Sequence, residues 1–172
     1  MSNLLPDFIF DSVRDISPAM LSEMGVKAVL CDLDSTLMSV KSSEIPKENA
    51  RWVQSVKDEG IVFMILSNNS REERVAKACE TLKVSYIHLA RKPLSGGYRA
   101  AIGKLSLKPS EIAMVGDQIY TDVLGANLLG MVTILVQSLD LDLFYIRARR
   151  LLEEPAISRA KKIINRRERS SQ

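Results

Sequence analysis

Between residues 27 and 137 the chain alternates short apolar runs with segments of helical periodicity, and this alternation limits the fold more than any other feature. Each apolar run is almost continuous, which is typical of strands that are buried on both faces of a parallel sheet. Strands joined through helices form right-handed crossovers, so we expect an α/β protein with a three-layer α/β/α, Rossmann-like fold. The expected strands are 27–32, 61–67, 84–89, 112–116 and 132–136, and the expected helices are 47–59, 71–82, 97–106 and 120–129.

Polar side chains follow four of these strands, at the point where each strand ends. They are Asp32 and Asp34, then Ser67 and Asn68, then Lys92, then Asp117 and Asp122. The carboxyl ends of parallel strands meet at one edge of a sheet, which is where open α/β sheets bind their ligands. The sequence therefore predicts that these residues form a single active site.

The segment Asp32-Leu33-Asp34-Ser35-Thr36 resembles the first motif, Asp-x-Asp-x-Thr, of the haloacid dehalogenase-like (HAD-like) phosphohydrolases. The resemblance implies a HAD-like fold and a phosphoric monoester hydrolase. It also implies that Asp32 attacks phosphorus to form an aspartyl phosphate. Asp34 would donate a proton to the leaving alkoxide and then activate water for the second half of the reaction.

The fourth motif of that family has its counterpart in Gly116-Asp117 and Asp122. By this resemblance Asp117 is a ligand of Mg²⁺, together with the Asp32 carboxylate and the backbone carbonyl of Asp34. Magnesium prefers such oxygen ligands. Asp122 would support the metal shell.

The second and third motifs imply the groups that bind the substrate phosphate. Ser67 matches the hydroxyl residue that donates a hydrogen bond to a phosphoryl oxygen, and Asn68 assists it through its backbone or its amide. Lys92 matches the lysine that neutralises the charge of the nucleophile and of the phosphoryl group. These assignments complete the expected catalytic and phosphate-binding set.

A narrower resemblance extends over nearly the whole chain, to the bacterial YqeG family, which is related to the mitochondrial-type phosphatidylglycerophosphatases (subclass IIIA). It rests on Pro6-Asp7, Asp11-Ser12-Val13, Leu66-Ser67-Asn68-Asn69, Arg91-Lys92-Pro93 and the segment 116–127. It implies that the substrate is phosphatidylglycerophosphate and the product phosphatidylglycerol. One departure is Ser35, where the family commonly has Asn.

The chain is expected to be one domain, with a core at about 26–137, an N-terminal extension over 1–25 and a basic helical segment over about 141–172. Ser17-Pro18 predicts the start of a short helix that ends at Gly25. Pro155 predicts a break between a helix over 141–153 and a second helix over 157–167. Between the first two motifs there is room for a small flap over 38–45 and no large cap domain.

The net charge of +3 is unevenly distributed. Residues 143–172 contain three acids and nine basic residues, which are Arg147, Arg149, Arg150, Arg159, Lys161, Lys162, Arg166, Arg167 and Arg169. Such a tail favours an anionic partner. With the apolar residues of 4–10 it could dock on anionic lipid, whereas the alternative is that those apolar residues cover the sheet and the basic face is solvated.

Two other functions are open from the sequence. One is a phosphatase for a small soluble phosphomonoester or a phosphoprotein, and the other is a protein associated with RNA or ribosome assembly. Nucleic acid is the less favoured partner because no basic motif with interleaved aromatic residues is present.

No apolar run approaches the roughly 20 residues that span a bilayer, and no secretory leader is evident, so we expect a cytoplasmic protein, peripheral at most on the inner face of the membrane. The two cysteines, Cys31 and Cys79, are expected to be buried thiols. A structural or surface role is expected for His88, the single histidine.

Overall fold

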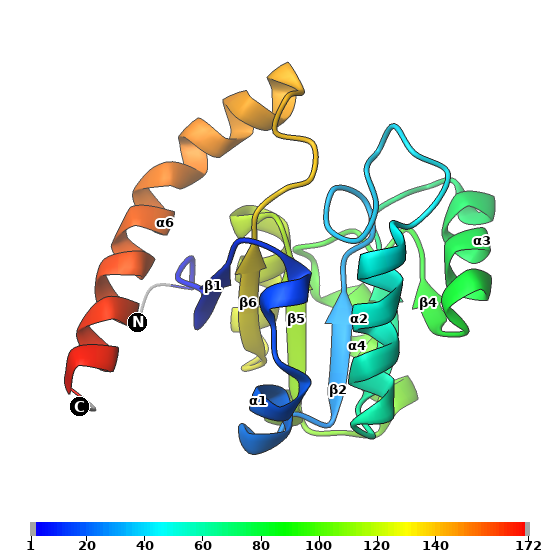
Figure 1. The fold of residues 1–172 in the computed structure, drawn as a ribbon, viewed down its shortest axis with the longest axis horizontal. Coiled ribbons are helices and arrows are strands. Elements are labelled where there is room, and N and C mark those ends of the chain that lie inside the picture. Colours follow the sequence, from blue (N-terminus) through cyan, green and yellow to red (C-terminus); the bar gives the residue numbers. More distant parts are fainter. Residues whose placement is uncertain (1–2, 171–172) are drawn as a thin grey trace.

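The computed structural model describes residues 3–170, apart from the side chains of Tyr145, Arg149, Arg150 and residues 165–170. Six strands form one parallel sheet in the order β1-β6-β5-β2-β3-β4 (Figure 1). The strands are β1 (Phe8–Phe10), β2 (Ala28–Cys31), β3 (Val62–Leu66), β4 (Ser85–Ile87), β5 (Ile112–Gly116) and β6 (Val132–Val136). All five expected strands are present.

Helices cover both faces of the sheet, which confirms the three-layer fold. Val29 and Cys31 of β2 face a core that contains Trp52 of α2 (Lys47–Asp58) and Val75 of α3 (Glu72–Leu82). The alternate residues of β2 face a second core, which contains Tyr98 of α4 (Ser95–Leu105) and Ala126 of α5 (Leu124–Asn127). The central strands are therefore buried on both sides, as their continuous apolar runs predict.

Three shorter turns connect these elements. They are 3-10 helices at Val13–Asp15 and Pro109–Glu111 and a π-helical turn at Ile119–Val123, which with α5 replaces the single helix expected over 120–129. The helix α1 (Pro18–Glu23) begins as predicted, with the Ser17 hydroxyl accepting a hydrogen bond from the amide of Met20. It stops just before Gly25, whose φ of +76° is readily available to glycine.

The strand β1 was not expected, and it adds the N-terminal segment to the edge of the sheet. Phe8, Ile9 and Phe10 pair in parallel with Ile134, Leu135 and Val136 of β6. Asp7 precedes the strand, and its backbone N–H donates to the carbonyl of Thr133 at 3.0 Å. This pairing supports the alternative in which the apolar residues of the N-terminus cover the sheet.

The predicted break at Pro155 is wrong, because α6 (Phe144–Ser170) is one continuous helix with Pro155 inside it. Proline removes one helical hydrogen bond and crowds the preceding turn, which costs about 3 kcal/mol or more in a helix interior. Contacts on both sides of it offset that cost here. Glu153, Ile157 and Ala160 are buried against the body, and the hydroxyl of Tyr120 donates to the carbonyl of Leu152 at 3.2 Å.

Only a loop separates β2 from α2, and one helix separates β3 from β4, so no large cap domain interrupts the described part of the chain. We refer to residues 38–45, in the loop between β2 and α2, as the flap. Figure 1 shows α6 beginning beyond the carboxyl end of β6 and running back alongside β1. Within residues 3–170, no helix has the length and apolar character that crossing a bilayer requires.

Candidate active site

The carboxyl ends of the strands bring together four charged residues, which we call the floor: Asp32, Lys92, Asp117 and Asp122. Asp32 directly follows β2, and its backbone N–H still donates to Val115 of β5 at 2.9 Å. Asp117 directly follows β5. Carboxylate oxygens of the three acids lie within 4.8 Å of one another, and all three residues are buried. The structure therefore gathers the residues that the strand ends predict.

Lys92 lies among these carboxylates and is 5% exposed. Its Nζ is 2.6 Å from Asp32 Oδ1 and 2.7 Å from Asp122 Oδ1. The hydroxyl of Thr36 lies between two of these acids, 3.5 Å from Asp32 Oδ2 and 3.4 Å from Asp117 Oδ1. One ammonium group is thus paired with two of the three clustered carboxylates.

The electrostatics of the floor are unbalanced without a further cation. Burial raises the pKa of Asp32 to about 7, and Asp122 and Asp117 add to the rise while Lys92 opposes it. Burial alone would lower the pKa of Lys92, but Asp122 and Asp32 outweigh that effect and raise it above its usual value. Three oxygen donors in a buried, negatively charged cluster are the donor set of a hard divalent cation.

Asp122, which is expected to support the metal shell, lies beside Asp32 and Asp117. Its carboxylate is inside the cluster, where Oδ2 accepts a hydrogen bond from the amide of Gln118 at 3.1 Å. This approach requires Gly116, because a Cβ at that position would lie 2.3 Å from the carboxylate of Asp122. The hydroxyl of Tyr98 fixes the π-helical turn that contains Asp122, by donating to the carbonyls of Thr121 and Asp122.

Ser67 and Asn68 directly follow β3, and their side chains have different partners. Ser67 is buried, and its Oγ accepts a hydrogen bond from the amide of Asn69 at 3.1 Å. The side chain of Asn68 brackets the backbone of Lys92, accepting from its N–H at 2.7 Å and donating to its carbonyl at 3.0 Å. The Asn68 amide therefore positions Lys92.

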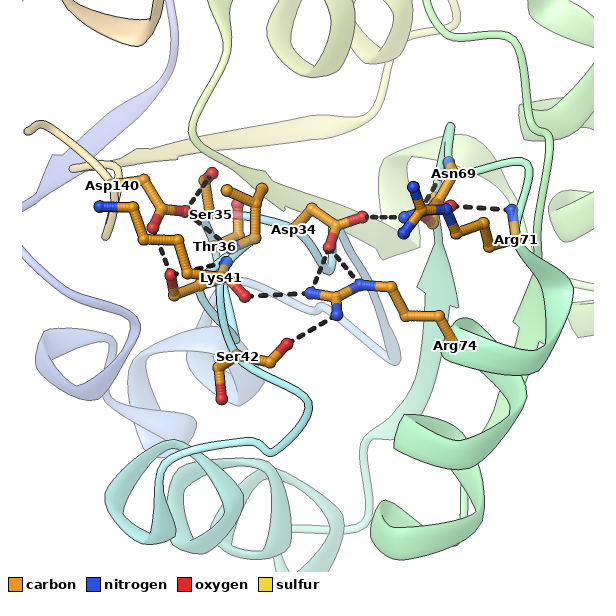
Figure 2. Close-up of polar contacts among 12 residues, drawn as sticks. Asp34, Ser35, Thr36, Lys41, Ser42, Asn69, Arg71, Arg74 and Asp140 are labelled. Atoms are coloured by element: carbon orange, nitrogen blue, oxygen red, sulfur yellow. Dashed lines mark hydrogen bonds and ion pairs between the residues drawn. The ribbon is translucent and has the colours of Figure 1, made fainter. Parts of the chain in front are cut away.

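Asp34, two residues after Asp32, is held by side chains outside the floor. Its Oδ1 lies 2.9 Å from both Nε and Nη2 of Arg74, and its Oδ2 accepts from Nδ2 of Asn69 at 2.7 Å (Figure 2). Arg74 lies on α3, and Asn69 lies in the loop between β3 and α3. The sequence analysis gave Asn69 no role of its own and did not single out Arg74.

Ser35 has a left-handed backbone conformation, with a φ of +66°. Asn adopts this region more readily than most residues, so the backbone conformation is compatible with the Asn that the resemblance leads us to expect here. Ser35 is held there by Asp140, whose Oδ2 accepts from the serine hydroxyl at 2.6 Å. The backbone N–H of Leu139 also donates to the carbonyl of Ser35 at 2.8 Å.

Asp140 is buried between β6 and α6 and binds the flap as well. It accepts hydrogen bonds from the hydroxyl of Ser39 and from the amide of Val40. Burial acts to raise the pKa of Asp140, but the hydrogen bonds from Ser35, Ser39 and Val40 outweigh it and hold the pKa below its usual range. No sequence motif pointed to this residue.

The long helix α6 also contacts the site, through Glu153. This side chain is buried, and its Oε1 accepts a hydrogen bond from the amide of Ile119 at 2.9 Å, two residues after Asp117. The expected buried thiols are confirmed at Cys31 and Cys79. His88 lies apart from the floor, 3.5 Å from Glu72.

The sequence is similar to known hydrolases and phosphatases. Residues 89–138 match the model of the family described as HAD-hyrolase-like. The chain is 35% identical over 159 residues to the probable phosphatase YqeG of Bacillus subtilis, and the match covers 92% of each chain.

Two solved structures share the fold. An uncharacterized protein from Listeria monocytogenes matches with a TM-score of 0.58 and 20% identity, over 65% of this chain and 79% of that chain. A HAD superfamily (subfamily III A) hydrolase from Legionella pneumophila matches with a TM-score of 0.51 and 18% identity, over 66% and 67%. With the extended match to YqeG, these findings show that the chain belongs to the YqeG family of HAD-like probable phosphatases.

Proposed function

We propose that the protein is a Mg²⁺-dependent phosphomonoester hydrolase that works through an aspartyl phosphate on Asp32. The observation that carries this proposal is the floor, where a buried Asp32 is paired with Lys92 beside Asp117 and Asp122. A carboxylate held in place by a buried ammonium group is ready to attack a phosphoryl group. The family relationship supports the same class of reaction.

In the first half of the reaction a carboxylate oxygen of Asp32 forms a bond to phosphorus, and the bond from phosphorus to the alcohol oxygen breaks. Asp34 gives its proton to that leaving oxygen. In the second half Asp34 takes a proton from water, and the water oxygen attacks the aspartyl phosphate. Inorganic phosphate leaves, and the Asp32 carboxylate is restored.

The donors of the floor suit a bound Mg²⁺. Asp32, Asp117 and the backbone carbonyl of Asp34 would hold the ion, with Asp122 supporting them. When bound, Mg²⁺ neutralises charge on the phosphoryl oxygens and balances the surplus of carboxylates. Lys92 and the hydroxyl of Ser67 bind the remaining phosphoryl oxygens. The side-chain amide of Asn68 keeps Lys92 in place by binding the Lys92 backbone.

For the substrate we propose phosphatidylglycerophosphate, presented at a membrane surface. Four apolar side chains are exposed in segments that follow the carboxyl ends of β4 and β6, and we call them the apolar rim: Leu89, Leu94, Leu139 and Phe144. Leu94 is 65% exposed and Phe144 is 86% exposed. Exposed apolar residues in segments that follow the strand ends, without a large cap in the described part of the chain, suit a lipid surface better than a small soluble substrate.

The helix α6 adds a surface that combines basic and apolar residues. Arg147, Leu151 and Leu152 are exposed in its first half, and Arg159 and Lys161 are exposed in its second half. RNA binding would use the charges and leave the leucines without a role. The side chains of Arg149, Arg150, Arg166, Arg167 and Arg169, which the basic-tail prediction also includes, lie outside the described part of the structure.

The reaction class is tested by measuring phosphate release with and without Mg²⁺ from lipid, sugar, nucleotide and phosphopeptide substrates. We expect Mg²⁺-dependent release, with the phosphoryl group found on Asp32 after rapid quenching and mass spectrometry. An adduct on another residue would contradict the mechanism, and a preference for a soluble ester would contradict the lipid assignment.

The lipid surface is tested with the double variant Leu94→Ser/Phe144→Ser. Turnover of phosphatidylglycerophosphate in vesicles should fall on the order of 10-fold or more, since each inserted side chain contributes about 1.5–3 kcal/mol when it is fully buried. Turnover of p-nitrophenyl phosphate should be unchanged. The matched control is Leu128→Ser/Val62→Thr, which removes exposed apolar groups elsewhere. Equal loss with both substrates would reject the membrane role of the rim.

A further inference from the structure

We propose that Arg74 is the positioning residue for Asp34, and that it links the orientation of this carboxylate to the position of the flap. This inference rests on the proposed function, in which Asp34 transfers protons to and from the reacting oxygens. It assigns a role to a side chain of α3 that no recognised motif contains. It also explains why Asp34 is paired with side chains outside the floor.

One planar guanidinium group makes all the relevant contacts (Figure 2). Nε and Nη2 of Arg74 are each 2.9 Å from Oδ1 of Asp34. Nη1 donates to the carbonyl of Ser42 at 2.6 Å, and Nη2 donates to the carbonyl of Ser39 at 3.0 Å. Both carbonyls belong to the flap, so one side chain holds the flap and the carboxylate together.

Asn69 holds the other oxygen of the carboxylate. Its Nδ2 donates to Oδ2 of Asp34 at 2.7 Å, and its own Oδ1 accepts from the backbone N–H of Arg71 at 2.8 Å, which fixes the direction of the amide. The carboxyl group of Asp34 has about four lone-pair sites when ionised, one of which carries the proton when Asp34 acts as an acid, and Arg74 and Asn69 together use three of the four. Capacity for one more partner remains, which is what a proton exchange with a leaving oxygen or a water requires.

The flap is also held from its opposite side. Asp140 binds the hydroxyl of Ser39 and the amide of Val40, while Arg74 binds the carbonyls of Ser39 and Ser42. A displacement of the flap therefore pulls on Arg74 and, through it, on Asp34. Misplacing a catalytic group by about 1 Å can cost on the order of 100-fold in rate, so this restraint matters for the proposed chemistry.

A lysine cannot reproduce this arrangement. Arg74 presents donors in a fixed plane to a carboxylate and to two carbonyls at once, whereas the ammonium of lysine is a single point of charge. Arg74→Lys therefore keeps the charge on α3 and removes the geometry. Arg74→Gln removes both, and Lys77→Gln, one turn further along the exposed side of α3, is the matched control for loss of charge.

The decisive measurement is how kcat/KM depends on the leaving group, because this constant reports the first half of the reaction. Glycerol phosphate has a poor leaving group that needs the proton from Asp34, whereas p-nitrophenyl phosphate has a good one that does not. In full-length protein we expect Arg74→Lys and Arg74→Gln to lower kcat/KM for glycerol phosphate by about 10- to 100-fold. The loss for p-nitrophenyl phosphate should be below about threefold, and Lys77→Gln should change neither.

Asp34→Asn separates this inference from the proposed function. If Asp34→Asn lowers kcat/KM equally for both substrates, Asp34 is not the general acid and the proposed mechanism fails. Asp34→Asn could instead lower kcat/KM for glycerol phosphate alone. If the Arg74 variants then lower kcat/KM equally for both substrates, Arg74 is only structural and this inference is overturned. In the double variant Asp34→Asn/Arg74→Lys the selective effect of Arg74 should disappear, because both changes remove the same proton transfer. A full additional selective loss there would also overturn the inference.

Discussion

Asp32 and Asp34 are separated by one residue, but they belong to two regions that are stabilised in different ways. The floor around Asp32 is buried and holds three carboxylates near one ammonium group, so it is electrostatically incomplete without a cation. Asp34 is partly exposed and is held by Arg74 and Asn69, while Asp140 holds Ser35 and the flap. We call these hydrogen bonds around Asp34 and the flap the flap network. The floor is therefore a cluster of like charges that a bound cation would balance, whereas the flap network holds its residues in one geometry through hydrogen bonds.

The largest effect is expected from Asp32→Asn, which tests the floor directly. It removes the nucleophile without changing the size of the side chain, so kcat should fall at least about 10,000-fold. The circular dichroism spectrum and the melting temperature should stay close to those of the wild type. Substantial phosphatase activity in this variant would show that the floor does not carry the chemistry.

Asp117→Asn should change the metal requirement of the floor. The Mg²⁺ concentration that gives half-maximal activity should rise at least about 10-fold, since even groups that only support a ligand alter metal affinity this much. Without metal the melting temperature should hold or increase, because one of three crowded negative charges is gone. A titration with an unchanged midpoint would remove Asp117 from the metal site.

Asp140→Ala tests the flap network, and its effect should depend on pH. Loss of the hydrogen bonds from Ser35, Ser39 and Val40 should lower the free energy of unfolding by about 1–3 kcal/mol at pH 7. Because the pKa of Asp140 is lowered in the folded protein, its contribution is present above the unfolded pKa of about 4 and is lost as the pH falls through the folded pKa.

The difference between wild type and Asp140→Ala in urea unfolding should therefore shrink as the pH is lowered from about 5 to 3. The control is Asp142→Asn, since Asp142 is exposed and is paired with Lys41. Its effect should stay below about 1 kcal/mol at every pH. A constant difference for Asp140→Ala across this range would show that the carboxylate charge is not what holds the flap.

The smallest effect is expected at Ser35. Ser35→Ala keeps the unfavourable φ of +66° and loses the bond to Asp140, so it should lower the free energy of unfolding by about 1–2 kcal/mol. Ser35→Asn should lie within about 1 kcal/mol of the wild type, because Asn tolerates this conformation. If Ala proved better tolerated than Asn in thermal unfolding, backbone conformation would not explain the residue found here.

The sheet and the floor could be predicted from the sequence because both follow from periodic patterns. The continuous apolar runs of β2, β3 and β5 identify strands covered on both faces, and a parallel arrangement then places Asp32 and Asp117 at one edge. The strand β1 lies outside the alternation of strands and helices, and its apolar run of three residues does not distinguish a strand from other buried chain. The continuity of α6 through Pro155 depends on tertiary contacts, which no local signal contains.

The flap network could not be predicted for a different reason. Arg74 contacts a carboxylate 40 residues away, and Asp140 contacts a serine 105 residues away. Neither has a spacing that distinguishes it from the many charged residues on exposed helical faces. Motifs report residues whose partners are fixed by the chemistry, whereas the partners of Arg74 and Asp140 are fixed only by the folded chain.

The pairing of β1 with β6 has a consequence for how the chain folds during synthesis. The amide of Asp7 bonds to Thr133, 126 residues away, so the first strand can join the sheet only after the last one has left the ribosome. Closing so long a loop carries a large entropic cost, and contacts of this separation slow folding. After β6 has emerged and before β1 pairs with it, the edge of β6 is open to pairing with other chains, which makes this stage of folding prone to aggregation.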